Sequence, residues 1–194
     1  LSRLKKQPDA YNYQRRTVAD FFRDVARDGF SATISDRWMW AGMRMNPTDI
    51  ADVTGATYSY LLNGRTAEEP WTAQFAPGER VLLRVINAAA GSYFDVRVPG
   101  LPMTVVQVSG QPVEPVETEE FRIAIAETYD VIVQLPDDRA YAVYSEAMDR
   151  SGFTAATLAS RAGGLASLPP RRRRPLLTMA DMGMDHSAMG GMDG

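Results

Sequence analysis

The spacing of apolar residues predicts two helices near the start of the chain. In the first helix the apolar side chains recur at i, i+3, i+4 and i+7, which places them on one face: Val18, Phe21, Phe22 and Val25. Thr17 is expected to cap this helix, with Asp20 near its positive end, and Gly29 is expected to stop it. A second, shorter helix is expected over Ser31–Met45, because Pro47 ends any helix nearby.

Beyond this region the apolar pattern changes to a period of two, which predicts β-strands. Turn signals such as Asn63-Gly64 and Pro77-Gly78 separate them. The expected strands are Thr57–Leu62, Arg80–Asn87, Ser92–Val98, Met103–Val108, Glu119–Ile125, Thr128–Leu135, Ala140–Glu146 and Phe153–Ala159. About eight short strands with no long helix between them are typical of an antiparallel sandwich or barrel, so we predict an all-β body.

The composition changes after Ser160. A stretch rich in Gly and Pro, with four arginines at 171–174, is too polar to form a core. The tail that follows is expected to be disordered, and it holds five of the ten methionines and the only histidine. We therefore expect a helical lead-in over 1–48, an all-β body, sandwich or barrel, over 49–160, a linker over 161–178 and a methionine-rich tail over 179–194.

The residue counts exclude several classes of function. The 194 residues include no cysteine and one histidine, which excludes disulfides, iron–sulfur clusters and thiol catalysis. The same counts exclude a blue-copper electron carrier and any copper, zinc or iron centre built from nitrogen and thiolate ligands. A net charge of −3 offers nucleic acid no basic surface, and no apolar run reaches the roughly 18 residues of a membrane span.

The tail carries the most specific chemical signal. Thioether sulfur is a soft ligand that suits Cu(I) or Ag(I). The alternative is a disordered linker that is rich in methionine by chance. We favour metal capture, because so dense a cluster has no packing explanation in a segment that cannot fold. The candidate soft-metal ligands are Met179, Met182, Met184, His186, Met189 and Met192.

A second group of methionines lies in the predicted second helix. Met39 and Met43 share one helical face. Methionine and aromatic residues at helical spacing usually fill core gaps, so we expect them to pack beside Trp38 and Trp40. The open alternative is a Cu(I) path lined by four methionines: Met39, Met43, Met45 and Met148.

Three charged groups are interpreted as structural. The arginines at 171–174 are expected to be a solvated linker, because the rest of the chain is acidic. Asp149 and Arg150 are expected to brace a turn between two strands. A solvated sheet edge that resists aggregation is favoured over acid–base catalysis for four crowded glutamates: Glu114, Glu117, Glu119 and Glu120.

Several motifs, taken together, resemble those of the bacterial copper-resistance multicopper oxidases. Each motif alone is a weak signal, whereas the set is specific and covers nearly the whole chain. The motifs are Arg44–Ile50, Tyr58–Gly64, Pro77–Arg80, Leu83–Asn87, Phe94–Leu101, Ala126–Val133, Met148–Gly152 and Pro175–Met184.

This resemblance implies a cupredoxin-like Greek-key β-sandwich within a larger protein. Such oxidases have three cupredoxin domains, with a mononuclear copper in the third and a trinuclear cluster between the first and third. Their ligands lie in His-x-His and His-Cys-His motifs, which this chain lacks. The resemblance therefore implies the middle domain plus the start of a methionine-rich region. It also implies a periplasmic protein, exported by a leader upstream of Leu1.

The function implied by the resemblance is that of a fragment of an oxidase. The complete protein is expected to oxidise Cu(I) or phenolic substrates and to reduce oxygen to water, with copper as its cofactor. The expected partners of this chain are the flanking cupredoxin domains, which it bridges, and copper ions, which its tail collects. No catalytic residue is expected within it. The chain opens without a methionine and stops inside a repetitive segment, which also suggests an excerpt. The alternative is a stand-alone, non-catalytic module that sequesters copper.

Overall fold

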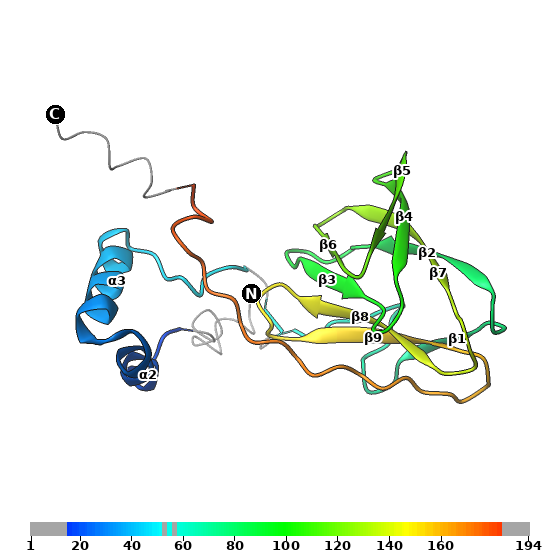
Figure 1. Cartoon of the computed structure of the whole chain (residues 1–194), viewed down its shortest axis with the longest axis horizontal. Coiled ribbons are helices and arrows are strands. Elements are labelled where there is room, and N and C mark those ends of the chain that lie inside the picture. Colours follow the sequence, from blue (N-terminus) through cyan, green and yellow to red (C-terminus); the bar gives the residue numbers. More distant parts are fainter. Residues whose placement is uncertain (1–14, 52–53, 56–57, 184–194) are drawn as a thin grey trace. The chain divides into compact units, whose positions relative to one another are not determined.

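The structure is a computed structural model, and it describes residues 15–51, 54–55 and 58–183. The chain divides into two units: Leu1–Ile50 and Pro175–Gly194 belong to the first, and Ala51–Arg174 form the second (Figure 1). Among the described residues, the helices belong to the first unit and the strands to the second.

The first unit contains α2 (Val18–Asp28) and α3 (Phe30–Gly42), which a single residue, Gly29, separates. Thr17 and Asp20 form the predicted cap of α2. The Thr17 hydroxyl accepts a hydrogen bond from the Asp20 N–H at 3.2 Å, and the Asp20 carboxylate accepts one from the Thr17 N–H at 2.7 Å. Gly29 has a φ of 87°, which glycine adopts without strain, so it ends α2 as predicted.

Helix α3 ends at Gly42, before the end predicted at Met45. Arg44 causes this, because its φ of 56° lies in the left-handed region and its N–H bonds back to the carbonyl of Ala41 at 3.0 Å. A residue in that conformation closes a helix, so the last turn stops short of the sequence prediction.

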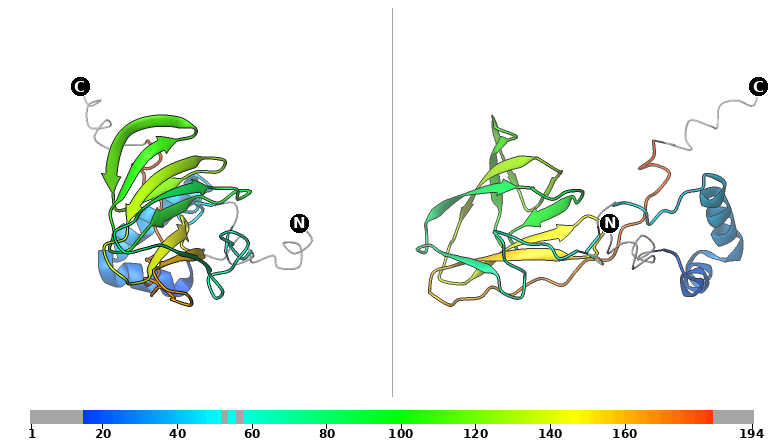
Figure 2. Two further views of the ribbon diagram at one scale, coloured as in Figure 1. Left: turned by 90° about the vertical axis from the view of Figure 1, so that its right-hand side faces the viewer. Right: turned by 180° about the vertical axis from the view of Figure 1, so that it is seen from behind.

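The second unit is a sandwich of two sheets, which Figure 2 shows from two further sides. The five-stranded sheet has the order β1-β9-β8-β3-β6 and consists of β1 (Trp71–Gln74), β3 (Phe94–Arg97), β6 (Phe121–Ile123), β8 (Tyr141–Ala147) and β9 (Phe153–Ala159). The four-stranded sheet has the order β2-β7-β4-β5 and consists of β2 (Arg80–Ile86), β4 (Met103–Val108), β5 (Gln111–Thr118) and β7 (Thr128–Gln134).

Neighbouring strands are antiparallel except for β1 and β9, which run parallel. This arrangement confirms the predicted all-β, cupredoxin-like sandwich. The core lies between the sheets, where alternate residues of each strand meet, as the period of two requires. Among its most buried side chains are Val96, Ile123, Val131 and Leu158. Strand β8 departs from alternation, because all seven of its residues are buried. Its outer face is therefore covered as well.

The first predicted strand does not form over the described residues 58–62. Leu62 only bridges Arg65 across a two-residue turn. Side chains hold the segment instead of a ladder of hydrogen bonds: the Tyr60 ring meets Phe94 edge to face, with ring centroids 5.0 Å apart. The alternating pattern there reflects this packing and not a strand, so that prediction is wrong.

Two strands, β1 and β5, were not predicted. Strand β5 contains Pro112 and Pro115, which resemble strand breakers in the sequence. It lies at the edge of its sheet, where a missing backbone N–H is tolerated. Strand β1 is only four residues long and pairs with β9, which lies far along the chain, so no local signal marks it.

Candidate functional site

Two of the predicted tail ligands, Met179 and Met182, lie half-buried in a short turn. Thr178 and Asp181 close this turn, because the Asp181 carboxylate accepts from the Thr178 N–H at 2.8 Å and hydroxyl at 2.7 Å. The bond from that hydroxyl lowers the pKa of Asp181. The Met182 N–H donates to the carbonyl of Met179 at 3.2 Å, so the two methionines are the first and last residues of one tight turn. Four further candidates lie outside the described residues: Met184, His186, Met189 and Met192.

The methionines of α3 and the loop after it are not core residues. Met39 and Met43 are half-buried, and Met45 is exposed. Of the two tryptophans expected beside them, Trp40 is buried, whereas Trp38 is 80% exposed. The packing of Met39 and Met43 beside these tryptophans stays a prediction.

A backbone hydrogen bond brings these two methionine groups into one unit. The Leu177 N–H donates to the carbonyl of Pro47 at 2.8 Å. Met179 follows Leu177 by two positions, and Met45 precedes Pro47 by two. The segment that enters the methionine-rich region thus lies beside the loop that leaves α3, although the two are far apart in the sequence.

Met148, the fourth member of the hypothetical Cu(I) path, belongs to the other unit. It is half-buried at the end of β8, and its N–H donates to the carbonyl of Tyr93 at 2.9 Å. A path along all four methionines stays a prediction.

The donor set does not fit a catalytic copper centre. Within the described residues there is no group of three or more His, Asp or Glu side chains placed to hold a metal ion. The whole chain has one histidine and no cysteine. Only thioether sulfur remains as an abundant soft donor, and it does not make the nitrogen and thiolate centres that reduce oxygen.

A network of buried charges occupies the outer face of the five-stranded sheet. Asp95 on β3 is 2% exposed and accepts from the Arg122 Nε at 2.7 Å. The Arg150 guanidinium approaches the same carboxylate within 2.6 Å. Burial disfavours ionisation of Asp95, but the hydrogen bonds from the two arginines outweigh it, so its pKa lies below the usual value.

The loop Met148–Gly152 delivers Arg150 to this network. Asp149 accepts from the Ser151 N–H at 3.0 Å and hydroxyl at 2.6 Å, and the Ser151 Oγ accepts from the Gly55 N–H at 2.7 Å. Arg150 itself has a φ of 60°, a costly conformation for a side chain of its kind. Asp149 braces the turn as expected, whereas Arg150 does more, because its side chain is 9% exposed and reaches the buried carboxylates.

The segment after β9, which we call the strap (residues 166–172), runs back along the outer face of the five-stranded sheet (orange in Figure 1). The Ala166 N–H donates to the Thr157 Oγ1 at 3.4 Å, and the Arg172 N–H donates to the Glu146 Oε1 at 3.0 Å. The strap therefore covers the face that carries Asp95 and Glu146.

Arg172 corrects the interpretation of the arginine run as solvated. Its guanidinium pairs with Glu120, donating from Nη1 at 3.0 Å, and its Nε lies 3.4 Å from Glu146. Burial lowers the pKa of Arg172, and the nearby Arg97 adds to this effect. Sequence reasoning missed this role because a run of four arginines does not reveal which one faces the sheet. A usable signal was Glu146, the one charged residue in the strand Tyr141–Ala147.

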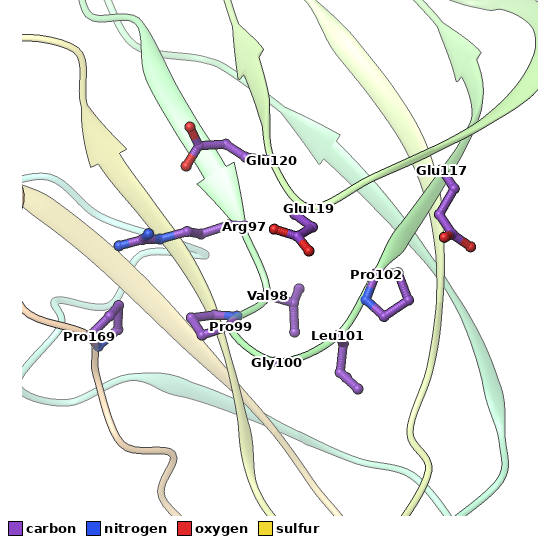
Figure 3. Close-up of a pocket in the computed structure, with 10 residues that line it drawn as sticks. All are labelled: Arg97, Val98, Pro99, Gly100, Leu101, Pro102, Glu117, Glu119, Glu120 and Pro169. Atoms are coloured by element: carbon purple, nitrogen blue, oxygen red, sulfur yellow. The ribbon is translucent and has the colours of Figure 1, made fainter.

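A cavity of about 720 Å³ lies at one end of this face. Figure 3 shows Arg97 and Pro169 on one side of it and Glu117 on the other, with the turn Val98–Pro102 along its floor. Glu119 and two neighbouring glutamates give it an acidic wall. The cavity offers no ligand set for a metal or cofactor.

Comparison with known proteins identifies the family. A model of the multicopper oxidases matches residues 17–163. The chain belongs to the multicopper oxidase family. It is 56% identical to copper resistance protein A of Escherichia coli, over the whole of this chain and 33% of that protein. It is 57% identical to copper resistance protein A of Pseudomonas syringae pv. tomato, over 98% of this chain and 31% of that protein.

The chain spans about a third of the length of these curated relatives. Among solved structures, the multicopper oxidase Fet3p, which functions in iron import, is 21% identical with a TM-score of 0.49, over 58% of this chain and 22% of that one. In the part of this chain that the structure describes, no helix is long and apolar enough to cross a membrane.

Proposed function

We propose that this chain is the middle cupredoxin domain of a periplasmic copper-resistance multicopper oxidase, together with the start of its methionine-rich region. The observation that carries this proposal is the match to two copper resistance proteins over nearly the full chain but only a third of their length. The absence of thiolate and the single histidine suit a domain whose neighbours hold the catalytic copper.

In the complete protein, copper would supply the oxidation of Cu(I) or phenolic substrates and the reduction of oxygen to water. This chain contributes no ligand to that chemistry. Its sandwich bridges the flanking domains, which are its principal partners. Isolated, it has no oxidase activity, and oxygen uptake above the free-copper background would contradict that assignment.

We further propose that the chain collects Cu(I) through thioether sulfur. A backbone hydrogen bond joins Met179 and Met182 across one turn, and this turn belongs to the same unit as Met39, Met43 and Met45. Thioethers stay neutral at every pH and prefer soft ions, so such a group captures Cu(I) without releasing a proton.

Cu(I) titration against a competing chromogenic chelator tests this function. Three variants in which methionine is replaced by leucine separate the groups: the five tail methionines, the three at 39, 43 and 45, and Met103 as a matched control in the core, where it is 1% exposed. We expect the tail variant to lose most of the affinity, the α3 variant to lose part, and the Met103 variant none. Unchanged affinity in the tail variant would refute Cu(I) collection and leave the family assignment intact.

The sequences on either side of this chain test the bridging role. Flanking His-x-His and His-Cys-His segments in the same reading frame are expected for an oxidase. A start codon near Leu1 and a stop after Gly194 would instead favour a stand-alone copper-sequestering module.

A further inference from the structure

A fully buried carboxylate lies in the middle of the five-stranded sheet. Glu146 on β8 is 0% exposed, and β8 is the central strand of that sheet. Its register partner on β3 is Asp95, so two acidic side chains stand next to each other on the outer face. Two adjacent buried carboxylates require cationic partners to remain charged.

Arginines from three different segments supply these partners. Arg122 comes from β6, Arg150 from the loop between β8 and β9, and Arg172 from the strap. Together with the acids they form a chain of alternating charge with equal numbers of each sign: Arg122, Asp95, Arg150, Glu146, Arg172 and Glu120. The strap supplies one guanidinium of this network, and without it Glu146 keeps only Arg150, whose Nη1 lies 3.9 Å away.

Both the main chain and the side chains of the strap bond to the sandwich. The Arg172 N–H bonds to Glu146 at 3.0 Å, and the Arg171 guanidinium donates to the carbonyl of Ser151 at 3.2 Å. Beneath the strap, Ala166 packs against a small apolar cluster formed by Ala142, Tyr144 and Ala155. Polar and apolar contacts thus act on the same short segment.

We propose that Glu146 and Arg172 form a latch that fixes the strap to the sandwich, so that the methionine-rich segment starts from a fixed point instead of a free linker. The chain leaves the sandwich unit at Arg174, two residues after the latch. The proposal does not depend on copper binding, since it concerns only contacts within the sandwich unit.

Limited proteolysis of the 194-residue chain with trypsin tests the latch. The run at 171–174 offers three cleavable arginine bonds, because Pro175 blocks the fourth. A backbone that is hydrogen-bonded to a buried carboxylate resists cleavage until it opens. Glu146→Gln keeps the shape of the side chain and every trypsin site but removes the charge. We expect it to speed cleavage in the run about tenfold. Glu120→Gln should have a smaller effect in the same direction.

Two comparisons make the result decisive. Glu119→Gln is the matched control, since Glu119 is exposed on the same loop and should leave the rate unchanged. Cleavage after Arg84 in β2 is used to report global unfolding. If the latch exists, Glu146→Gln should speed cleavage in the strap but not after Arg84. The proposal is overturned if the strap of the unaltered chain is cut as fast as an unstructured peptide of the same sequence. An unchanged rate in Glu146→Gln, or equal acceleration at the strap and at Arg84, would overturn it as well.

Discussion

The two sheets of the sandwich carry the same kind of ion pair in opposite surroundings. On the outer face of the four-stranded sheet, Arg84 and Asp130 approach within 3.5 Å, with side chains 74% and 15% exposed. On the outer face of the five-stranded sheet, Arg150 and Asp95 approach within 2.6 Å, with side chains 9% and 3% exposed. Water screens the first pair, so it contributes little to stability, whereas loss of one partner in the second pair leaves a buried charge.

The difference arises from what covers each face. Strand β2 presents Leu82 and Ile86 outward at 48% and 67% exposure, whereas every residue of β8 is buried. Because the strap covers it, the outer face of the five-stranded sheet is buried although it carries charged side chains. The same Arg–Asp pair therefore contributes differently to the free energy of unfolding, depending on whether another segment of the chain, here the strap, covers it.

The largest expected effect is on the covered face. Asp95→Ala removes the carboxylate that pairs with both Arg122 and Arg150, and it leaves Arg150 buried without its closest partner. We expect a loss of about 3–5 kcal/mol in the free energy of unfolding, measured by urea denaturation. A loss below about 1 kcal/mol would mean that the covered and open faces do not differ in the way described.

The pH dependence of stability should follow the same network. Because the folded pKa of Asp95 lies below its unfolded value, the carboxylate stabilises the fold above the unfolded pKa of about 3.9. That contribution is lost as the pH falls through the lower, folded pKa. Urea denaturation between about pH 5 and pH 2 should show a steeper loss of stability in the unaltered chain than in Asp95→Asn. Parallel curves would exclude Asp95 as a source of the acid sensitivity.

A smaller effect, of opposite sign, is expected at Tyr144. Its hydroxyl is buried and has no hydrogen-bond partner among the described residues, and burial raises its pKa to about 12. Tyr144→Phe removes this unpaired polar group and keeps the ring that stacks on Phe153 at 5.2 Å. We expect stability to rise by about 0.5–1 kcal/mol in thermal or urea unfolding. A clear loss of stability would indicate that the hydroxyl has a partner.

The smallest effect is expected on the open face. Asp130→Ala breaks the pair with Arg84, whose guanidinium is open to solvent, and the expected cost is about 0–1 kcal/mol. Added salt should reduce even that cost, because it screens exposed charges. Measuring Asp130→Ala beside Asp95→Ala, at low and high salt, gives the comparison directly. A cost for Asp130→Ala as large as that for Asp95→Ala would contradict it.

Sequence reasoning succeeded where the signal is local. The capping pair Thr17 and Asp20 lies within one turn, and the strand Met103–Val108 is joined by a tight turn to one of its two neighbours, β5. It failed where the partner is distant. Strand β1 is formed by pairing with β9, which is distant in the sequence. The alternating residues around Tyr60 reflect packing on Phe94 and not a strand.

The candidate site divides in the same way. The tail methionines could be identified as candidate ligands from the amino-acid composition alone. Their preference for soft metals depends on the residue type and not on the fold. The proximity of Leu177 to Pro47 could not be predicted from the sequence. A single backbone hydrogen bond between distant segments requires no particular residue type in either segment. Among four consecutive arginines, only the structure distinguished Arg172, which faces Glu146.

By itself, the sequence determined that the body of this protein is all-β, a sandwich or a barrel, and that its soft donors are thioethers and not thiolates. Both follow from periodicity and residue count, which need no knowledge of distant contacts. The tertiary structure alone decided which charges are buried. Burial depends on whether the strap returns over the sheet, and this gives Asp95, Glu146 and Arg172 a weight that the similar pair Arg84 and Asp130 lacks.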